Sequence, residues 1–226
     1  SQDWISASGG TRSKITVVPN GVDVSAAPTP APVLQSETFT CVYAGAHGVA
    51  NGLDTVVRAA SHLEELPGGE KVRVRLIGSG PTKASLEDLA RELGTKQLEF
   101  RDPVPKEEVA AELAAADACI LHLKRMPTFS YGVSPNKLFD YLLAGRPVIY
   151  GVEAANDPVS EADAGVTIAS EDPAALAAAM IELSQKTTQE RQAMSDRGHR
   201  YVMENHDWAV LSVRIEKVLE QVLTQA

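Results

Sequence analysis

The sequence predicts an α/β fold built on a Rossmann-like, doubly wound parallel sheet. Short runs rich in Val, Ile and Leu alternate along the chain with helical patterns. This alternation is typical of parallel strands joined by helices, which then cover both faces of the sheet. In such sheets the ligand lies at the carboxyl ends of the strands, where we expect the polar features of this chain to gather.

The elements are expected in the following order. A first strand at 14–21 ends in a Pro-Asn-Gly turn, and a proline-rich polar loop or linker follows at 24–37. The further expected strands span 39–45, 72–80, 98–102, 118–123, 147–151 and 164–168. The expected helices span 53–66, 82–93, 106–115, 135–143, 173–185, 188–205 and 208–223. We therefore divide the chain into an N-terminal segment with a linker remnant, 1–35, and one Rossmann-like domain, 36–226.

Composition excludes several classes of protein. The net charge of −9 over 226 residues argues against a nucleic-acid binder, because binding to nucleic acid depends on Lys and Arg that neutralise phosphates. It also argues against an anionic membrane surface as the main partner, and no apolar run is long enough to span a membrane. Cys41 and Cys119 lie in apolar runs and are expected to be buried free thiols in a reducing compartment. The first residues resemble the middle of a domain and lack an initiator Met, so we expect a piece of a longer protein.

The helix expected at 135–143 carries the clearest sign of a binding site. Ser134 suits the N-cap and Pro135 the first helical position, which leaves the amides of Asn136 and Lys137 without partners inside the helix. These amides and the helix dipole form a ready anion site. Asn136, Lys137 and Asp140 share one helical face, so amides and an ammonium for phosphates lie beside a carboxylate for hydroxyls. This combination suits a nucleotide; the alternative is a surface helix with a weak Lys137–Asp140 ion pair.

Glycines at strand ends strengthen the case for a ligand. Backbone without side chains can approach a ligand closely, and it recurs at three places: Gly45 and Gly48 around His47, Gly78 and Gly80 before a helix, and Gly132 before the helix at 135–143. Neither glycine pair completes the dinucleotide fingerprint, since Lys83 stands where the third glycine would be. Taken alone, His47 is more often a structural or exposed histidine than a site residue.

Five stretches occur in an order that resembles a known family: "TVVPNGVD", "YAGAHGVANGLDTVVRAA", "VRLIGSGP", "FRDPVPKEEVAAELAAADACIL" and "SPNKLFDYLLAGRPVI". They resemble the donor-binding half of GT-B glycosyltransferases of the retaining family 4, also called group 1. The resemblance covers the chain from Ile15 onward. The Gly-x-His-Gly loop and the Ser-Pro-x-Lys helix are similar to those of bacterial transferases that move N-acetylated amino sugars in polysaccharide assembly.

The resemblance implies roles for individual residues. Asp140 stands where the family has a glutamate that holds the ribose hydroxyls. The family's other glutamate, which contacts the donor sugar, falls at Gly132, so the amides around Val133 and Ser134 are the expected substitutes. The segment from Asp102 to Val104 matches the one whose backbone holds the nucleobase, and residues 78–81 border the same pocket.

The family's basic pair is missing from its usual positions. It falls at Ala46 and Asn51, and neither residue is basic. The resemblance therefore implies that His47 and Lys137 stabilise the diphosphate leaving group, with Arg125 as a further candidate.

The resemblance also implies an activity and partners. We expect metal-independent transfer, with retention, of a sugar from a nucleotide-sugar, UDP-linked by analogy, and no cofactor. The acceptor would be a glycan or a polyprenyl-linked molecule held by a domain absent from this chain, so the chain alone would not transfer sugar. The place of action would be the cytoplasm, at the inner face of the cell membrane for the full-length protein. The last helix is expected to pack on its own domain; the alternative is that it exposes Leu and Val side chains and drives dimerisation.

Other functions stay open beside this one. A non-catalytic nucleotide-sensing module would suit the loss of the acid at Gly132 and of the basic pair. A UDP-sugar 2-epimerase shares the fold, although the His and acid constellation of such enzymes is not evident. A dinucleotide oxidoreductase would need the full glycine fingerprint.

Overall fold

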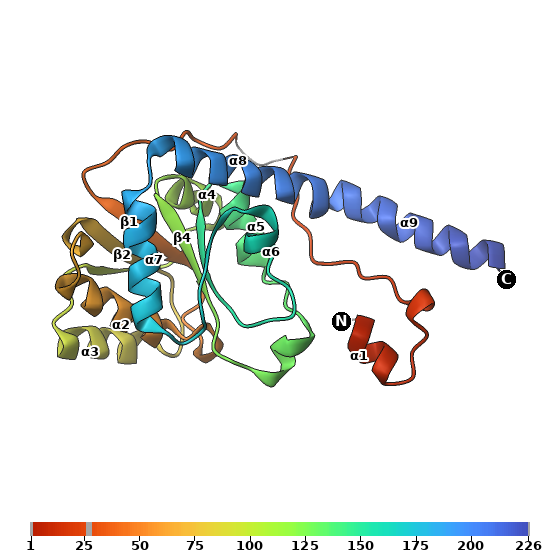
Figure 1. Cartoon of the computed structure of the whole chain (residues 1–226), viewed down its shortest axis with the longest axis horizontal. Helices are drawn as coiled ribbons and strands as arrows, with labels where there is room; N and C mark the ends of the chain where they lie inside the picture. Colours follow the sequence, from red (N-terminus) through yellow and green to blue (C-terminus); the bar gives the residue numbers. More distant parts are fainter. Residues whose placement is uncertain (1, 26–28, 226) are drawn as a thin grey trace.

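The computed structural model describes residues 2–25 and 29–225, and its centre is a sheet of six parallel strands (Figure 1). The strand order is β3-β2-β1-β4-β5-β6. Their bounds are β1 Phe39–Ala44, β2 Val72–Ile77, β3 Leu98–Arg101, β4 Ala118–His122, β5 Val148–Gly151 and β6 Gly165–Thr167. This order is that of a Rossmann-like, doubly wound sheet, so the expected fold class is confirmed.

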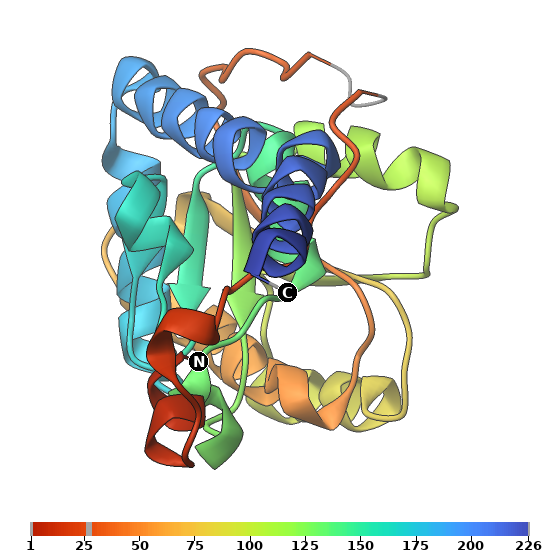
Figure 2. The ribbon, with the colours of Figure 1, turned by 90° about the vertical axis from the view of Figure 1, so that its right-hand side faces the viewer.

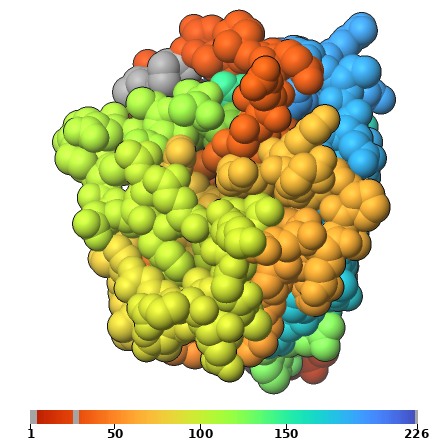
Figure 3. All heavy atoms as spheres, turned by 90° about the vertical axis from the view of Figure 1, so that its left-hand side faces the viewer, coloured from red at the N-terminus to blue at the C-terminus, as the bar shows by residue number. Residues whose placement is uncertain are grey.

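Helices cover both faces of the sheet. One layer contains α2 (Leu53–His62), α3 (Lys83–Leu93) and α7 (Pro173–Gln185). The other contains α4 (Lys106–Ala114), α5 (Asn136–Leu143), α6 (Pro158–Ala162) and α8 (Thr188–Asn205). Figure 3 shows the side of the molecule near β3, where the segment from α3 to α4 forms the yellow to yellow-green surface.

Two hydrophobic cores lie on the two faces of the sheet. In β4 all five residues are buried, with Ile120 in the core under α2 and α7 and Leu121 in the core under α5 and α8. Burial on both sides explains why this strand is a continuous apolar run without alternation. Cys41 and Cys119 are buried free thiols, as expected, and they belong to opposite cores.

The sheet changes direction between β1 and β4. From β1 the chain builds outward to β2 and β3, and from β4 it builds the opposite way to β5 and β6. The connections that leave two such neighbouring strands go to opposite faces, which opens a crevice at their carboxyl ends. The loop after β1 and the segment that leads from β4 into α5 therefore meet at the natural ligand position.

Three expectations about local structure are wrong. Residues 14–21, expected as a strand, form none, and in this region only Val22 pairs, with Asp207. Helix α5 begins at Asn136 with Pro135 at the N-cap, one residue later than the expected cap at Ser134. The short helices α1 (Gln2–Ala7) and α6 were not expected. Within the loop expected at 24–37, residues 26–28 lie outside the described residues.

The last helix, α9 (Trp208–Gln225), extends away from the body of the protein (Figures 1 and 2). Its first turns pack through the buried Leu211. Farther along, the apolar side chains of Ile215, Leu219 and Leu223 are exposed, and Leu223 keeps 78% of its surface accessible. The expectation that this helix packs fully on its own domain is therefore wrong for its second half. No helix in the described parts of the chain has the length and apolar character needed to cross a lipid bilayer.

Candidate functional site

A pocket of about 410 Å³ lies at the carboxyl ends of β1 and β2, beside the start of α5. Backbone of two glycine-containing loops forms one wall, and side chains of α5 form another. Its lining residues are Ala44, Gly45, Ala46, Ile77, Gly78, Ser79, Pro103, Val104, Val109, Lys137 and Asp140. The pocket therefore occupies the crevice that the strand order predicts.

The loop after β1 is held in place by three polar side chains. The carbonyl oxygen of Ala46 accepts hydrogen bonds from the hydroxyl of Tyr43 at 2.7 Å and from Nδ2 of Asn51 at 2.9 Å. The hydroxyl of Tyr141, on α5, bonds with both the N–H and the carbonyl of Ala44 at 3.0 Å. The backbone that faces the pocket is thus fixed before any ligand arrives, which lowers the entropic cost of binding.

The two glycine loops pack backbone against backbone. A Cβ on Gly78 would lie 2.0 Å from the carbonyl oxygen of Gly45, and one on Gly80 would lie 2.5 Å from that of His47. The N–H of His47 donates to the carbonyl of Ser79 at 2.8 Å. Close contact between the loops, together with positive φ at Gly45, Gly78 and Gly80, requires these glycines. Gly48 is less constrained, because its nearest neighbour would be Asn51 Nδ2 at 3.4 Å.

Lys137 points from α5 into the loop after β1. Its Nζ donates to the hydroxyl of Tyr43 at 2.7 Å and to Oδ1 of Asn51 at 3.0 Å, and it lies 4.4 Å from the centre of the Tyr43 ring. Among the described residues no carboxylate pairs with it, so the alternative of a Lys137–Asp140 ion pair is wrong. Burial without a counter-charge lowers the pKa of Lys137 from 10.5 to about 8.

Asp140 lies one turn farther along the same face of α5, at the rim of the pocket. Partial removal from water raises the pKa of its carboxyl group, and the nearby charge of Lys106 lowers it. Lys137 and Asp140 therefore present a positive and a negative group to one pocket, as the sequence predicted, without neutralising each other.

His47 is held away from the pocket. Its side chain is completely buried, and neither ring nitrogen has a hydrogen-bond partner among the described residues. Burial and the charge of Lys83 lower the pKa of His47, which favours the neutral imidazole. Its carbonyl accepts from the N–H of Thr82 at 3.1 Å and from the hydroxyl of Thr82 at 2.7 Å. What the structure shows for this residue is a link between the two loops.

The segment before α5 is clamped by Asn156. Its side chain accepts from the N–H of Val133 and donates to the carbonyl of Val133, each at 2.8 Å. The Val133 amide is therefore already engaged. Gly132 has a φ of +105°, and a Cβ there would lie 3.1 Å from Asn156 Oδ1. Any side chain at position 132 would therefore be strained.

A residue outside the predicted set, Asn20, reaches the start of α5 from the N-terminal segment. Its Nδ2 donates to the carbonyl of Ser134 at 2.8 Å and to Oδ1 of Asn136 at 3.0 Å. Its N–H donates to the hydroxyl of Ser134 at 3.2 Å, and its carbonyl bonds with Nδ1 of His206 at 3.0 Å. Ser134 and Asn136 thus direct their side chains to Asn20. The sequence marked Asn20 only as part of a Pro-Asn-Gly turn, and nothing in the turn indicated a contact with α5.

The predicted nucleobase segment only partly lines the pocket. Val104 lies in the wall, whereas the carboxylate of Asp102 is exposed and pairs with Lys83 at 2.7 Å, which lowers the pKa of Asp102. Arg125 is engaged elsewhere, since its Nε pairs with Glu153 at 2.9 Å.

Of the predicted site residues, five line the pocket together: Gly45, Gly78, Val104, Lys137 and Asp140. The others are not among its lining residues: His47, Gly48, Gly80, Asp102, Gly132, Val133, Ser134 and Asn136. Spacing in the sequence did not identify Ala46, Ser79 or Val109 individually, because their place in the wall depends on how the loops pack.

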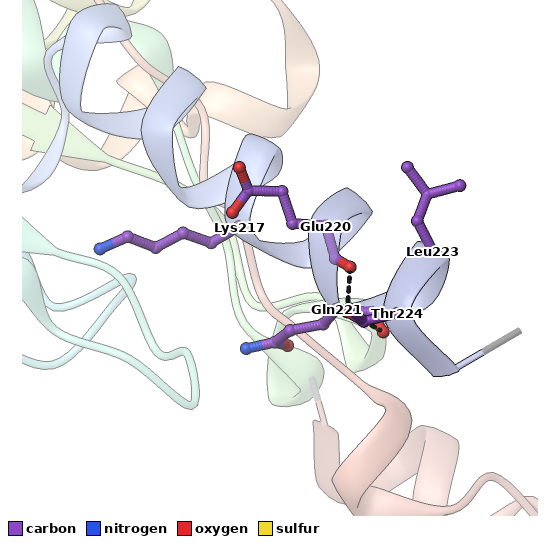
Figure 4. A pocket seen from close by; sticks show the side chains of 5 residues that line it. All are labelled: Lys217, Glu220, Gln221, Leu223 and Thr224. Atoms are coloured by element: carbon purple, nitrogen blue, oxygen red, sulfur yellow. Dashed lines mark hydrogen bonds between the residues drawn. The ribbon is translucent and has the colours of Figure 1, made fainter.

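A second hollow lies along α9 and is lined by Lys217, Glu220, Gln221, Leu223 and Thr224 (Figure 4). All of its lining side chains come from α9, so it is a shallow groove on the surface of one helix. None of its residues belongs to the loops at the carboxyl ends of the strands. Within residues 2–25 and 29–225, no group of three His, Cys, Asp or Glu side chains is placed to hold a metal ion.

The strand order and the pocket at the switch point define a class: a Rossmann-like α/β domain that matches one half of a GT-B glycosyltransferase. A family model described as glycosyl transferases group 1 matches residues 38–186. The chain therefore belongs to this family.

Solved structures with the same fold are distant in sequence. Sucrose-phosphate synthase from Thermosynechococcus elongatus is 18% identical, with a TM-score of 0.73 over 93% of this chain and 53% of that one. Anabaena Alr3699/HepE in complex with UDP and glucose is 15% identical, with a TM-score of 0.72 over 97% and 60%. A glycosyltransferase from Rickettsia africae is 13% identical, with a TM-score of 0.76 over 96% and 59%. This chain spans 53% to 60% of the length of these proteins. A comparison with curated protein sequences finds no match.

Proposed function

We propose that this chain is the donor-binding part of a family 4 retaining glycosyltransferase that takes a sugar from a UDP-linked donor. Residues 36–226 form the donor domain, and residues 1–35 form an N-terminal segment with part of an interdomain linker. The donor sugar is an N-acetylated amino sugar, and the product belongs to a bacterial polysaccharide. The acceptor, a glycan or polyprenyl-linked molecule, is bound by a further domain, in the cytoplasm and at the inner face of the membrane.

One observation carries the proposal: Lys137 and Asp140 face the same pocket from one helix, opposite a wall of glycine-rich backbone. An ammonium and backbone amides suit a diphosphate, while a carboxylate suits the hydroxyls of a ribose. Lys137 and Asp140 are about one helical turn apart, so a phosphate and the adjacent ribose of one nucleotide can reach both side chains. The pocket has the position where doubly wound sheets bind nucleotides.

The chemistry follows from where charge develops. When the bond between the sugar and the diphosphate breaks, negative charge grows on the leaving phosphate. The Lys137 ammonium hydrogen-bonds Asn51, and Asn51 bonds Ala46; Asn51 and Ala46 are the two positions where the family's basic pair would stand. We assign Lys137 the stabilising role, with the helix amides beside it and no metal or cofactor. A role for protonated His47 stays a prediction, and its lowered pKa argues against it.

The decisive test is calorimetric titration with UDP, GDP, ADP and NAD. The expected result is UDP binding that weakens in Asp140→Ala and Lys137→Ala. Matched controls are Asp88→Ala on the exposed face of α3 and Lys186→Ala after α7, both paired with residues outside the pocket. Binding of no nucleotide, or UDP binding that survives both pocket substitutions, would contradict the proposal.

A non-catalytic nucleotide-binding module is the second candidate, and the glycine at position 132 favours it. Both candidates predict UDP binding, so transfer separates them. Label from a UDP-linked sugar should reach acceptor in the presence of the full-length protein and not of its Lys137→Ala variant. Tight UDP binding without any transfer, across a panel of lipid-linked acceptors, would favour the binding module.

A further inference from the structure

The Lys137 ammonium is held by two uncharged side chains, Tyr43 and Asn51. An ammonium has three N–H donors, and two of them are taken by Tyr43 and Asn51. No third acceptor for Nζ is present among the described residues, and Lys137 lines the pocket. The third donor is thus left for a ligand.

The orientation of both acceptors is set by a single carbonyl. The hydroxyl proton of Tyr43 goes to Ala46 O, so the oxygen of that hydroxyl offers its lone pairs to Lys137. The Nδ2 of Asn51 goes to the same Ala46 O, which turns its Oδ1 toward Lys137. The Ala46 carbonyl therefore accepts one hydrogen bond from Tyr43 and one from Asn51, which leaves an acceptor oxygen of each side chain facing the Lys137 ammonium.

A second layer holds Asn51 itself. Nε2 of His122 accepts from the N–H of Glu171 at 3.0 Å, so the ring proton is on Nδ1. Nδ1 then donates to the carbonyl of Asn51 at 2.9 Å. Both ring nitrogens of this buried histidine are used, and the backbone of Asn51 is fixed from below.

We propose that Tyr43 and Asn51 are positioning residues that hold the Lys137 ammonium, with one N–H directed at an anionic ligand, and keep it charged without a counter-ion. A carboxylate in their place would hold the ammonium equally well but would repel the ligand. Two neutral acceptors orient the charge and leave it uncompensated for the ligand. The choice of a diphosphate as that ligand rests on the proposed function.

The titration of Lys137 provides a readout that is separate from activity. The titratable groups around it among the described residues include Tyr43 on β1, His47 in the loop after β1, and Asp140 and Tyr141 on α5. Burial raises the pKa of Tyr43 above 10 and lowers that of His47 below 6.5. Burial also raises the pKa of Asp140, whereas it lowers that of Lys137 to about 8, and chemical labelling of the amine reports on Lys137 alone.

The experiment measures the pKa of Lys137 directly. The chain is labelled with a trace of acetic anhydride from about pH 6 to about pH 11, and mass spectrometry of the peptide with Lys137 gives the reactivity of its amine. UDP and inorganic pyrophosphate affinities are measured over the same range. Three variants are compared with the wild type: Tyr43→Phe, Asn51→Asp and the control Tyr150→Phe, whose buried hydroxyl has no partner among the described residues.

Opposite shifts are expected. Tyr43→Phe removes an acceptor from the charged form, so the pKa of Lys137 falls and affinity at neutral pH weakens about tenfold. Asn51→Asp adds a negative charge, so the pKa rises while affinity for pyrophosphate still falls. Tyr150→Phe should change neither quantity. Circular dichroism establishes that each variant is folded.

The results separate this inference from the proposed function. An unchanged pKa in Tyr43→Phe, or a lowered pKa in Asn51→Asp, would overturn the positioning role whatever the chain binds. If the wild type binds neither UDP nor pyrophosphate, the proposed ligand is wrong. The labelling would then still decide whether Tyr43 and Asn51 control the ammonium.

Discussion

Gly45 is the residue at which a single methyl group most directly tests the site. Its φ is +150°, and an added Cβ would lie 3.2 Å from Nζ of Lys137 and 3.4 Å from the Tyr43 hydroxyl. In Gly45→Ala the backbone strain costs about 1–3 kcal/mol. The contact with Nζ is tighter than ordinary packing, so the ammonium must move by a few tenths of an ångström.

Gly94→Ala is the matched control. Gly94 also has a positive φ, +67°, but an added Cβ would have nothing within 4 Å. Its cost is about 1 kcal/mol of backbone strain, partly offset because alanine restricts the unfolded chain. This offset is common to both variants. The difference in stability and UDP affinity between Gly45→Ala and Gly94→Ala therefore measures the effect of the contact with Lys137 and Tyr43.

The assays are thermal unfolding and UDP titration. We expect Gly45→Ala to lose about 2 kcal/mol of stability, which lowers Tm by about 4–8 °C in a chain of this size, and to bind UDP about tenfold more weakly. Gly94→Ala should lose less stability and bind UDP normally. Wild-type UDP affinity in Gly45→Ala would refute the reasoning, because the displaced ammonium would then have no part in binding.

Three more predictions concern the start of α5, a buried ion pair beside the amino ends of β1 and β4, and the titration of Lys137. Asn20→Ala loses both side-chain bonds to the start of α5 and should weaken UDP binding severalfold in titrations, and Asn20→Asp should not restore it because it lacks the amide donor. Asp117→Ala removes the carboxylate that lies 3.3 Å from Arg191, which is 2% exposed and keeps a hydrogen bond to the Leu34 carbonyl at 3.4 Å; urea unfolding should show a loss of about 3 kcal/mol, and a loss under 1 kcal/mol would contradict this. Because the folded-state pKa of Lys137, about 8, is below 10.5, the unfolded chain binds more protons between these values. The stability of the wild type relative to Lys137→Met should therefore rise with pH across that window, and a difference that is flat with pH would show that Lys137 is not desolvated.

The sheet could be predicted because its information is local. The central strands β1, β4 and β5 are largely apolar runs, each followed by a helix, and α8 spans the expected residues 188–205. The error at 14–21 has a tertiary cause. The Ile-Thr-Val-Val run has strand propensity, but these residues pair with no strand, and Val17 and Val18 remain exposed.

The site could be predicted where glycines and a helix start mark it, and not where distant residues complete it. Lys137 and Asp140 share a helical face, so spacing alone placed them together. Asn20 is 114 residues from Ser134, and Asn156 is 23 residues from Val133. No pattern in a single sequence connects such pairs. The same holds for Tyr43, whose hydroxyl meets Lys137 only when β1 and α5 pack together.

The pocket has one further property, which concerns folding. Strands β1, β2 and β3 are consecutive in the chain and so are β4, β5 and β6, whereas the contact between β1 and β4 joins segments far apart in the sequence. Pairing among β1, β2 and β3, or among β4, β5 and β6, closes shorter loops than pairing β1 with β4. Pairing within each half of the sheet, a set of three strands, therefore carries a smaller entropic cost. Gly45 and Gly78 belong to the first half, and Lys137 and Asp140 belong to the second. The pocket therefore forms only when these two halves of the sheet dock. The rate at which ligand binding appears during refolding would measure the rate of that docking step.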